Sequence, residues 1–121
     1  MKRAPEYVGA QFTIVCQELP DGSCPVGEFL DGLDESDRNK LDVLFERLGD
    51  HGRISNREKF KKVEDKIWEF KSFQIRVLCF HAPNREVILC HWEIKKGDRL
   101  KPSTVKIAQE RFSIFFQNLK R

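Results

Sequence analysis

Two apolar, β-branched and aromatic runs of the chain carry positive charges where a core strand normally carries none. The run at 66–80 reads KIWEFKSFQIRVLCF and holds Arg76, and the run at 87–96 reads VILCHWEIKK and ends on Lys95 and Lys96. Cations grouped on one face of a sheet can bind the phosphates of a nucleic acid. The pattern predicts a sheet with one open face that binds a phosphate backbone.

Arg76 lies in a run that is apolar on both sides, so we expect it to be largely covered. An arginine in such a place is almost never left without a partner. Two environments satisfy it: an internal ion pair, with Glu69 or Glu93 as the partner, or a cleft in which the guanidinium binds an anion. The residues alone leave both open.

Alternation along the run at 86–94 assigns its side chains to two faces. One face is apolar and is expected to pack against helices; it comprises Ile88, Cys90, Trp92 and Ile94. The other face ends in His91, Glu93 and Lys95, three groups that can bind or transfer protons. His91 is the candidate acid or base, because an imidazole titrates near neutral pH.

Further candidate RNA contacts lie beside these runs. Trp68 has lysines on either side, including Lys71, and a tryptophan in that setting can stack on a base while the lysines hold the backbone. A core tryptophan is the alternative. Arg99 and Lys101 follow the lysine pair in a basic turn, which is either a phosphate contact or an ordinary solvated turn.

These residues require a mixed scaffold of strands and helices. Turn residues, helix caps and apolar spacing predict the following order: a strand at 11–19, a short helix opening at Pro25, a longer helix after 34–36 that stops at Gly49 or Gly52, a polar basic connector at 53–65, strands at 66–73, 74–82 and 86–94, and a helix opening at Pro102. This β-α-α-β-β-β-α order predicts an α+β domain whose helices pack on one face of an antiparallel sheet.

The length of 121 residues fits a single domain over 1–121, and a charged fraction of 34% with 40% hydrophobic residues is typical of a globular chain. No apolar run reaches the roughly 20 residues that cross a bilayer, and no apolar stretch follows the first cations, so we expect a cytoplasmic protein without membrane contact. The net charge is −6 over residues 1–52 and +9 over residues 53–121. This asymmetry favours a polyanion-binding half, with solvated helix faces of unlike charge as the alternative.

The four cysteines and three histidines show no metal-binding spacing. Three of the cysteines lie in strand-like runs, so we expect reduced core thiols rather than disulfides. We expect neither a metal nor a small-molecule cofactor.

The ordered set of these runs resembles the RelE/ParE superfamily of toxin–antitoxin toxins, and within it the HigB-like, phage-derived branch. The resemblance rests on the connector at 60–63, the strand pieces at 67–71, 75–80 and 89–96, and then Pro102 and Ala108. It covers about residues 53–115. It implies a RelE-like fold (the fold of microbial ribonucleases) and the activity of a metal-independent mRNA interferase in the ribosomal A site. It also implies a cognate helix-turn-helix antitoxin, together with the ribosome and mRNA as partners.

Carried over by position, the resemblance assigns catalysis to Arg76, Lys95 and Lys96, with His91 at the position of the family's histidine. In the implied reaction a ribose 2′-OH attacks the adjacent phosphate while basic side chains stabilise the developing charge. We expect alanine at Arg76, or at both lysines, to abolish toxicity without unfolding the chain.

Two departures from the family pattern bear on activity. RelE itself uses a tyrosine near its C-terminus, but the only tyrosine of this chain is Tyr7. Relatives place lysines on the first strand of the meander where this chain has Glu69, whose carboxylate can pair with Arg76 and weaken cleavage. A non-nucleolytic binder therefore stands as the alternative: a topoisomerase-poisoning toxin, an inactive phage-derived protein, or a general RNA-binding domain.

Overall fold

The computed structural model describes residues 2–95, 97 and 99–120. Its elements are β1 (Tyr7–Val8), β2 (Thr13–Cys16), α1 (Pro25–Asp31), α2 (Glu35–His51), β3 (Phe60–Glu64), β4 (Ile67–Ser72), β5 (Ile75–Ala82), β6 (Glu86–Ile94) and α3 (Pro102–Leu119). The α+β class is confirmed, and the three predicted helices and the β4–β6 meander lie within a few residues of their expected positions. Two strands were not expected: β1, and β3 within the supposed connector.

The strands form one sheet in the order β1-β2-β6-β5-β4-β3. All neighbours are antiparallel except β2 and β6, which are parallel. A parallel neighbour requires a long return connection, and the chain between β2 and β6 contains both α1 and α2. The sheet is therefore an antiparallel meander of β3 to β6, extended beyond β6 by the N-terminal strands β2 and β1.

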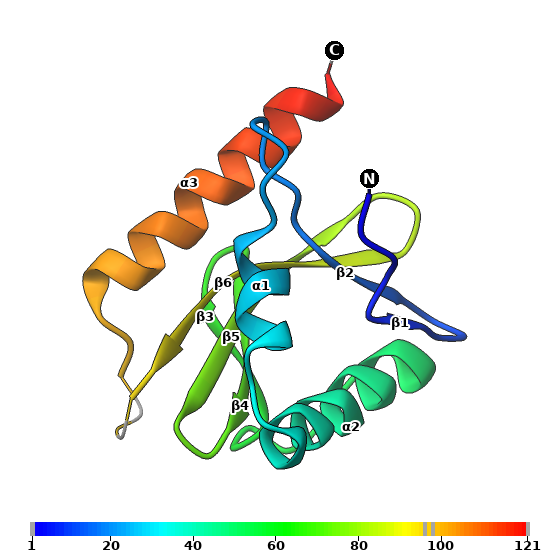
Figure 1. Ribbon diagram of the computed structural model, residues 1–121, viewed down its shortest axis with the longest axis vertical. Helices are drawn as coiled ribbons and strands as arrows, with labels where there is room; N and C mark the ends of the chain where they lie inside the picture. The colour runs from blue at the N-terminus through cyan, green and yellow to red at the C-terminus, as the bar shows by residue number, and fades with distance from the viewer. Residues whose placement is uncertain (1, 96, 98, 121) are drawn as a thin grey trace.

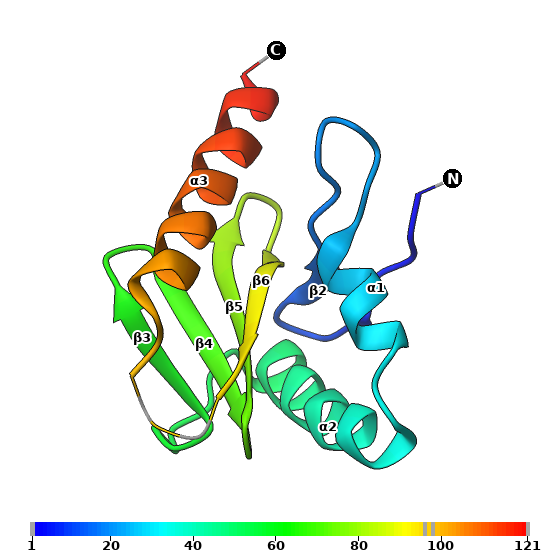
Figure 2. The same ribbon diagram turned by 60° about the vertical axis from the view of Figure 1, so that its left-hand side comes forward.

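The helices cover both faces of the sheet, so the expectation of helices on one face was wrong. Apolar residues of α1 and α2, among them Leu30 and Phe45, pack with Phe70 and Val77 on one face. Ala108 and three phenylalanines of α3 pack with the opposite face, which includes Leu78, Phe80 and Ile88. Figures 1 and 2 show α3 on one side of the strands and α1 with α2 on the other. The central strand β5 is apolar on both faces because each face has a helix layer to bury it.

A bulge in β6 reverses the predicted alternation of its faces. Leu78 pairs with His91, but the next residue, Cys79, pairs with Leu89, so Cys90 is an extra residue. Beyond the bulge, Trp92 turns toward α1 and stacks on Phe29 with ring centroids 4.8 Å apart. His91 and Glu93 therefore face α3, whereas alternation had placed Trp92 with Ile88.

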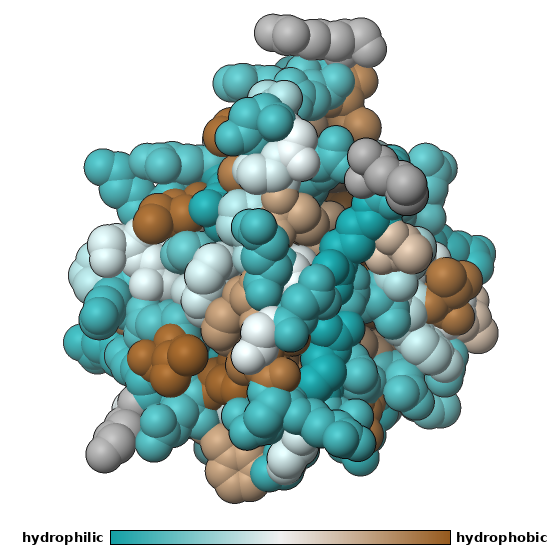
Figure 3. Space-filling model, viewed as in Figure 1, coloured by the Kyte–Doolittle hydropathy of each residue, from teal (hydrophilic) through white to brown (hydrophobic). Residues whose placement is uncertain are grey.

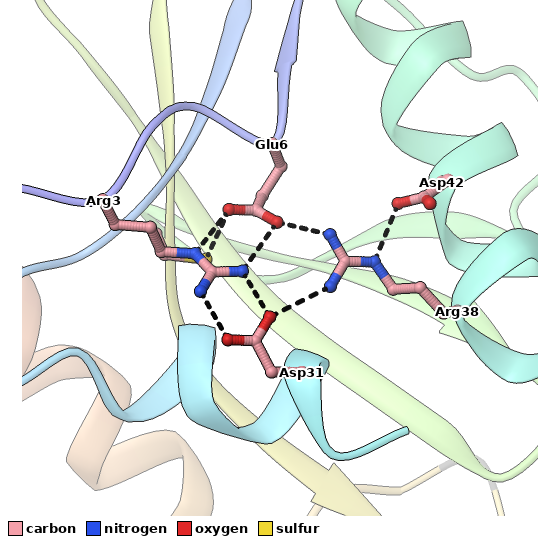
Figure 4. A network of polar contacts seen from close by, with 6 residues as sticks. Arg3, Glu6, Asp31, Arg38 and Asp42 are labelled. Carbon is pink, nitrogen blue, oxygen red and sulfur yellow. Dashed lines mark hydrogen bonds and ion pairs between the residues drawn. The ribbon is translucent and has the colours of Figure 1, made fainter. Parts of the chain in front are cut away.

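An ion network ties the N-terminal segment to the first two helices (Figure 4). Glu6, whose side chain is 3% exposed, pairs with Arg3 and Arg38, and these arginines also contact Asp31 and Asp42. Burial alone would raise the pKa of Glu6, but the hydrogen bonds and charges of both arginines outweigh it and lower that pKa. The network neutralises part of the acidic half within the fold.

Candidate nucleic-acid interface

A cavity of about 450 Å³ opens on the α3 side of the sheet, where β3 and β4 meet the loop before α3. Four cationic side chains line it: Arg57, Lys61, Lys62 and Arg99. Its other lining residues are Glu64, Glu69, Val63, Leu100 and Val105. We call this cavity the basic pocket; the number and sign of its cations suit a polyanion.

Strand pairing explains how the basic pocket forms. Lys61 of β3 lies directly opposite Glu69 of β4, so both point to the α3 face. The apolar residues of α3 lie over the sheet farther along, and Val105 and Leu100 form the pocket's apolar wall. The helix thus leaves the β3 end of the sheet uncovered for charged groups.

The carboxylate of Glu69 is the unusual group of this pocket. The residue is 0% exposed, and neither carboxylate oxygen has a hydrogen-bond partner. The Lys61 ammonium lies 3.7 Å from Oε1, which is an ion pair rather than a hydrogen bond. Burial raises the pKa of Glu69, and the charges of Lys61, Arg76 and Lys71 offset this only in part.

We expect Glu69→Gln to stabilise the protein at pH 7–8. Because the native pKa lies above that of the unfolded chain, native Glu69 holds its proton to higher pH, and its contribution to stability falls as pH rises through the native pKa. The amide avoids a buried charge whose oxygens accept no hydrogen bond, so the free energy of unfolding should rise by about 1 kcal/mol or more. Urea titrations at pH 4 and pH 7.5 measure the gain.

The gain should disappear at pH 4, where the protonated carboxyl of Glu69 in the parent and the amide in the variant are both neutral. Glu58→Gln is the control, because Glu58 has a side chain that is 78% exposed, and it should change stability by less than about 0.5 kcal/mol at either pH. A loss of stability in Glu69→Gln at pH 7.5 would mean that the Lys61 pair outweighs the burial of the carboxylate.

Arg76 is 2% exposed and is held by main-chain carbonyls. Its Nη1 donates to the Phe73 oxygen at 2.5 Å, and its Nη2 donates to the Gly97 oxygen at 2.7 Å. Neither Glu69 nor Glu93 is a hydrogen-bond partner of the guanidinium among the described residues, and Arg76 does not line the basic pocket. The arginine fastens the β4–β5 turn to the loop that follows β6.

Glu93 joins the other predicted cations to the start of α3. The Lys95 ammonium lies 3.6 Å from its Oε2, while its Oε1 accepts the backbone N–H of Lys101 at 3.1 Å and the Thr104 hydroxyl. Burial would raise the pKa of Glu93, but these hydrogen bonds and the nearby lysines lower it. The carboxylate thus stabilises the N-terminus of α3 by accepting hydrogen bonds from its first residues. Lys96 lies outside the described residues.

His91 lies between the sheet and α3 and is not among the residues that line the basic pocket. Its Nδ1 is 3.1 Å from Nη1 of Arg111, which also donates to the Cys90 carbonyl oxygen at 2.7 Å. Burial, with a smaller effect of the Arg111 charge, lowers the pKa of His91. The imidazole is therefore neutral at pH 7.

Of the remaining predicted contacts, Trp68, Lys71 and Lys101 lie outside the lining of the basic pocket and Arg99 is part of it. Trp68 stacks on Phe60, with ring centroids 5.1 Å apart, and packs against the core, which agrees with its interpretation as a core tryptophan. Lys71 ends β4 with its ammonium 3.4 Å from Glu58, and Lys101 is exposed at the start of α3. Arg99 is the predicted site residue that lines the basic pocket.

The sequence-based prediction missed three of the pocket's cations: Arg57, Lys61 and Lys62. Their signal was the lysine-rich stretch REKFKK, which was interpreted as a connector because its apolar residues are few. In the structure it leads into the edge strand β3, and lysines are common on edge strands.

The described residues contain no group of three or more His, Cys, Asp or Glu side chains arranged to hold a metal ion. Their helices include none with the length and apolar character needed to cross a membrane. The four cysteines are free thiols.

The sequence model of a family described as phage-derived protein Gp49-like (DUF891) matches residues 28–113. This range runs from α1 to the middle of α3 and includes every residue that lines the basic pocket. No curated protein matches the chain.

Proposed function

Since the chain belongs to the Gp49-like family of phage-derived proteins, a RelE-like family of toxins, we propose that it is the toxin of a type II toxin–antitoxin system. The proposed activity is that of a ribosome-dependent endoribonuclease that cuts mRNA. A cognate antitoxin neutralises it. The RelE-like α+β fold and the family membership support this proposal.

The basic pocket is the observation that carries the proposal. It combines four cationic side chains with two carboxylates, Glu64 and the buried Glu69, at one place on the sheet. Cations stabilise the charge that develops on the phosphoryl oxygens of the transition state. A carboxylate whose pKa is raised by burial is a suitable acceptor for the proton of a ribose hydroxyl.

In the proposed reaction the 2′-oxygen attacks the adjacent phosphorus as its proton passes to the base. The bond from phosphorus to the 5′-oxygen breaks as that oxygen takes a proton from water, which leaves a 2′,3′-cyclic phosphate on one product and a 5′-hydroxyl on the other; the base then returns its proton to solvent. Glu69 suits the role of base better than His91, because it lines the pocket and His91 does not. Movement of the Lys61 ammonium onto a bound phosphate would uncover the carboxylate.

Induction of the protein in growing cells, followed by mapping of message 5′ ends, tests the proposal. Growth should stop, and new 5′ ends should appear within translated messages but not when translation is blocked beforehand. Growth arrest with DNA damage and intact messages would instead identify a topoisomerase poison. If neither growth arrest nor message cleavage is observed, the protein is a non-nucleolytic binder.

Cells that also express the adjacent reading frame provide the second arm of this test. A short helix-turn-helix protein encoded there should restore growth and co-purify with this chain. Cleavage that continues in its presence would contradict the toxin–antitoxin proposal while leaving the nuclease assignment intact.

A further inference from the structure

The turn between β4 and β5 presents a phenylalanine to solvent. Ser72 and Ile75 are paired across the strands, so the loop consists of only two residues. The first of them, Phe73, is 69% exposed and has a φ of 55°. An aromatic residue is thus placed at the tip of a tight hairpin.

The backbone conformation at this position does not favour a phenylalanine. A positive φ is a glycine conformation in short hairpins, and a bulky residue adopts it at an energetic cost. Arg76 holds the turn in place through the Phe73 carbonyl oxygen, a contact that glycine would preserve. The positive φ and the exposure of the ring together favour a functional contact at this position.

Cations surround the ring. The Lys40 ammonium lies 4.3 Å from the ring centroid and that of Lys59 lies 5.9 Å from it. Phe73 and these lysines line a depression of about 230 Å³ together with Arg47, Val43, Leu44 and Ser72. We call it the Phe73 depression. No acidic side chain of the described residues lines it.

Two cations of helix α2, Lys40 and Arg47, face this depression, whereas the third, Arg38, points elsewhere. Arg38 is held by Glu6, Asp31 and Asp42 in the ion network. Lys40 and Arg47 instead share the stripe of the helix that contains Val43, which is 50% exposed. Figure 3 shows scattered apolar patches among hydrophilic side chains on the lower half of this view, where Figure 1 places α2 and the adjoining ends of the strands.

The segment before β3 contributes to both the basic pocket and the Phe73 depression, although the pocket opens on the α3 side of the sheet and the depression lies on the α2 side. Arg57 lines the pocket, and Lys59, two residues later, lines the depression. A flexible polyanion that occupies the pocket can reach the exposed ring by passing around the edge strand β3. This shared segment and the cationic lining favour a nucleic acid over a protein partner.

We propose that the Phe73 depression is a second RNA subsite, in which the Phe73 ring stacks on an unpaired base and Lys40, Arg47 and Lys59 bind the flanking phosphates. Aromatic rings flanked by cations bind single-stranded RNA in this way, with little dependence on base identity. The proposal rests on the proposed function for the choice of RNA as the ligand. It places the subsite outside the reacting centre.

Phe73→Gly tests the proposal, because stability and binding should respond differently. The full-length protein is titrated into a fluorescent, unstructured oligoadenylate at low salt, and thermal unfolding is measured in parallel. Loss of one stacked base should weaken binding by about 5- to 100-fold. The melting temperature should stay equal to that of the parent or rise, because glycine adopts the positive φ without strain.

Two controls accompany the variant. Phe73→Trp should bind the oligoadenylate at least as tightly as the parent, because the larger ring still stacks. Val8→Ala alters a side chain that is 70% exposed on β1 and should leave binding unchanged. Equal binding by the parent and Phe73→Gly would overturn the subsite.

Three outcomes separate this proposal from the proposed function and from a protein-docking surface. If the parent binds RNA and loses binding when Arg57, Lys62 and Arg99 are replaced, but not when Phe73 is replaced, only the subsite fails. If the parent does not bind RNA at all, both fail. If Phe73→Gly binds RNA normally but escapes neutralisation by the antitoxin, the depression is a protein-docking surface and the RNA subsite is wrong.

Discussion

Replacement of Arg57, Lys62 and Arg99 by alanine together is expected to reduce message cleavage by about 100-fold or more without unfolding the protein. All three are exposed and line the basic pocket. Removal of groups that stabilise charge in a transition state costs about 10²- to 10³-fold in rate for a single well-placed donor. Exposed cations contribute little to folding, so thermal stability should change only slightly.

A matched variant separates a local effect from one of total charge. Lys2, Arg85 and Lys120 are exposed and lie outside the basic pocket, and their replacement by alanine removes the same three charges. Primer extension on a reporter message should show near-parental cleavage for this control. Equal losses in both triple variants would show that net charge, rather than the pocket, drives the activity.

The salt dependence of binding gives an independent readout. The affinity for oligoadenylate should fall less steeply with salt in the pocket variant than in the parent, because fewer counterions are released when fewer phosphates are contacted. A slope equal to that of the parent would remove these three residues from the RNA contact.

Arg76→Ala is expected to destabilise the protein by about 3 kcal/mol or more. The change removes a buried side chain and leaves the carbonyl oxygens of Phe73 and Gly97 without the donors that now serve them. These hydrogen bonds are part-buried, so their loss adds to the cost of truncating a long side chain that is itself 2% exposed. Urea unfolding at pH 7 measures the loss, and Arg76→Lys should recover part of it because an ammonium can serve one of the two carbonyls.

A loss of toxicity in Arg76→Ala can therefore result from unfolding as well as from the loss of a catalytic group. The sequence placed Arg76 in the catalytic set and predicted loss of activity in a folded variant, whereas the hydrogen bonds give it a structural role as well. Cleavage should therefore be assayed at a temperature at which Arg76→Ala remains folded. Unchanged stability with abolished cleavage would assign the guanidinium to the phosphate and not to the turn.

None of Arg76, His91 and Lys95, the described members of the catalytic set predicted from sequence, lines the basic pocket, although Arg76 lies directly opposite Glu93 in the sheet. Arg76 fastens two loops, and Lys95 pairs with Glu93 beside the start of α3. His91 contacts Arg111 under the same helix. Arg99 is the predicted site residue that reaches the basic pocket, and Glu69, which was expected as a partner of Arg76, lines it as well.

The local sequence determined the elements themselves. Apolar alternation defined β4, β5 and β6, and Pro25 and Pro102 marked the first residues of α1 and α3. These signals depend on residues a few positions apart, so they can be recognised without the rest of the molecule. The excess of cations after residue 52 likewise identified the half of the chain that contains the basic pocket.

Only the tertiary structure decided which side chains face one another. The extra residue at Cys90 reverses the faces of β6, and alternation cannot reveal a bulge in advance. Burial of both sheet faces came from the placement of α3 opposite α1 and α2. Lys61 meets Glu69 because β3 pairs with β4, and Arg76 donates to the carbonyl oxygen of Gly97, 21 residues away. Such contacts depend on pairing and packing across the whole fold, which no short stretch of sequence encodes.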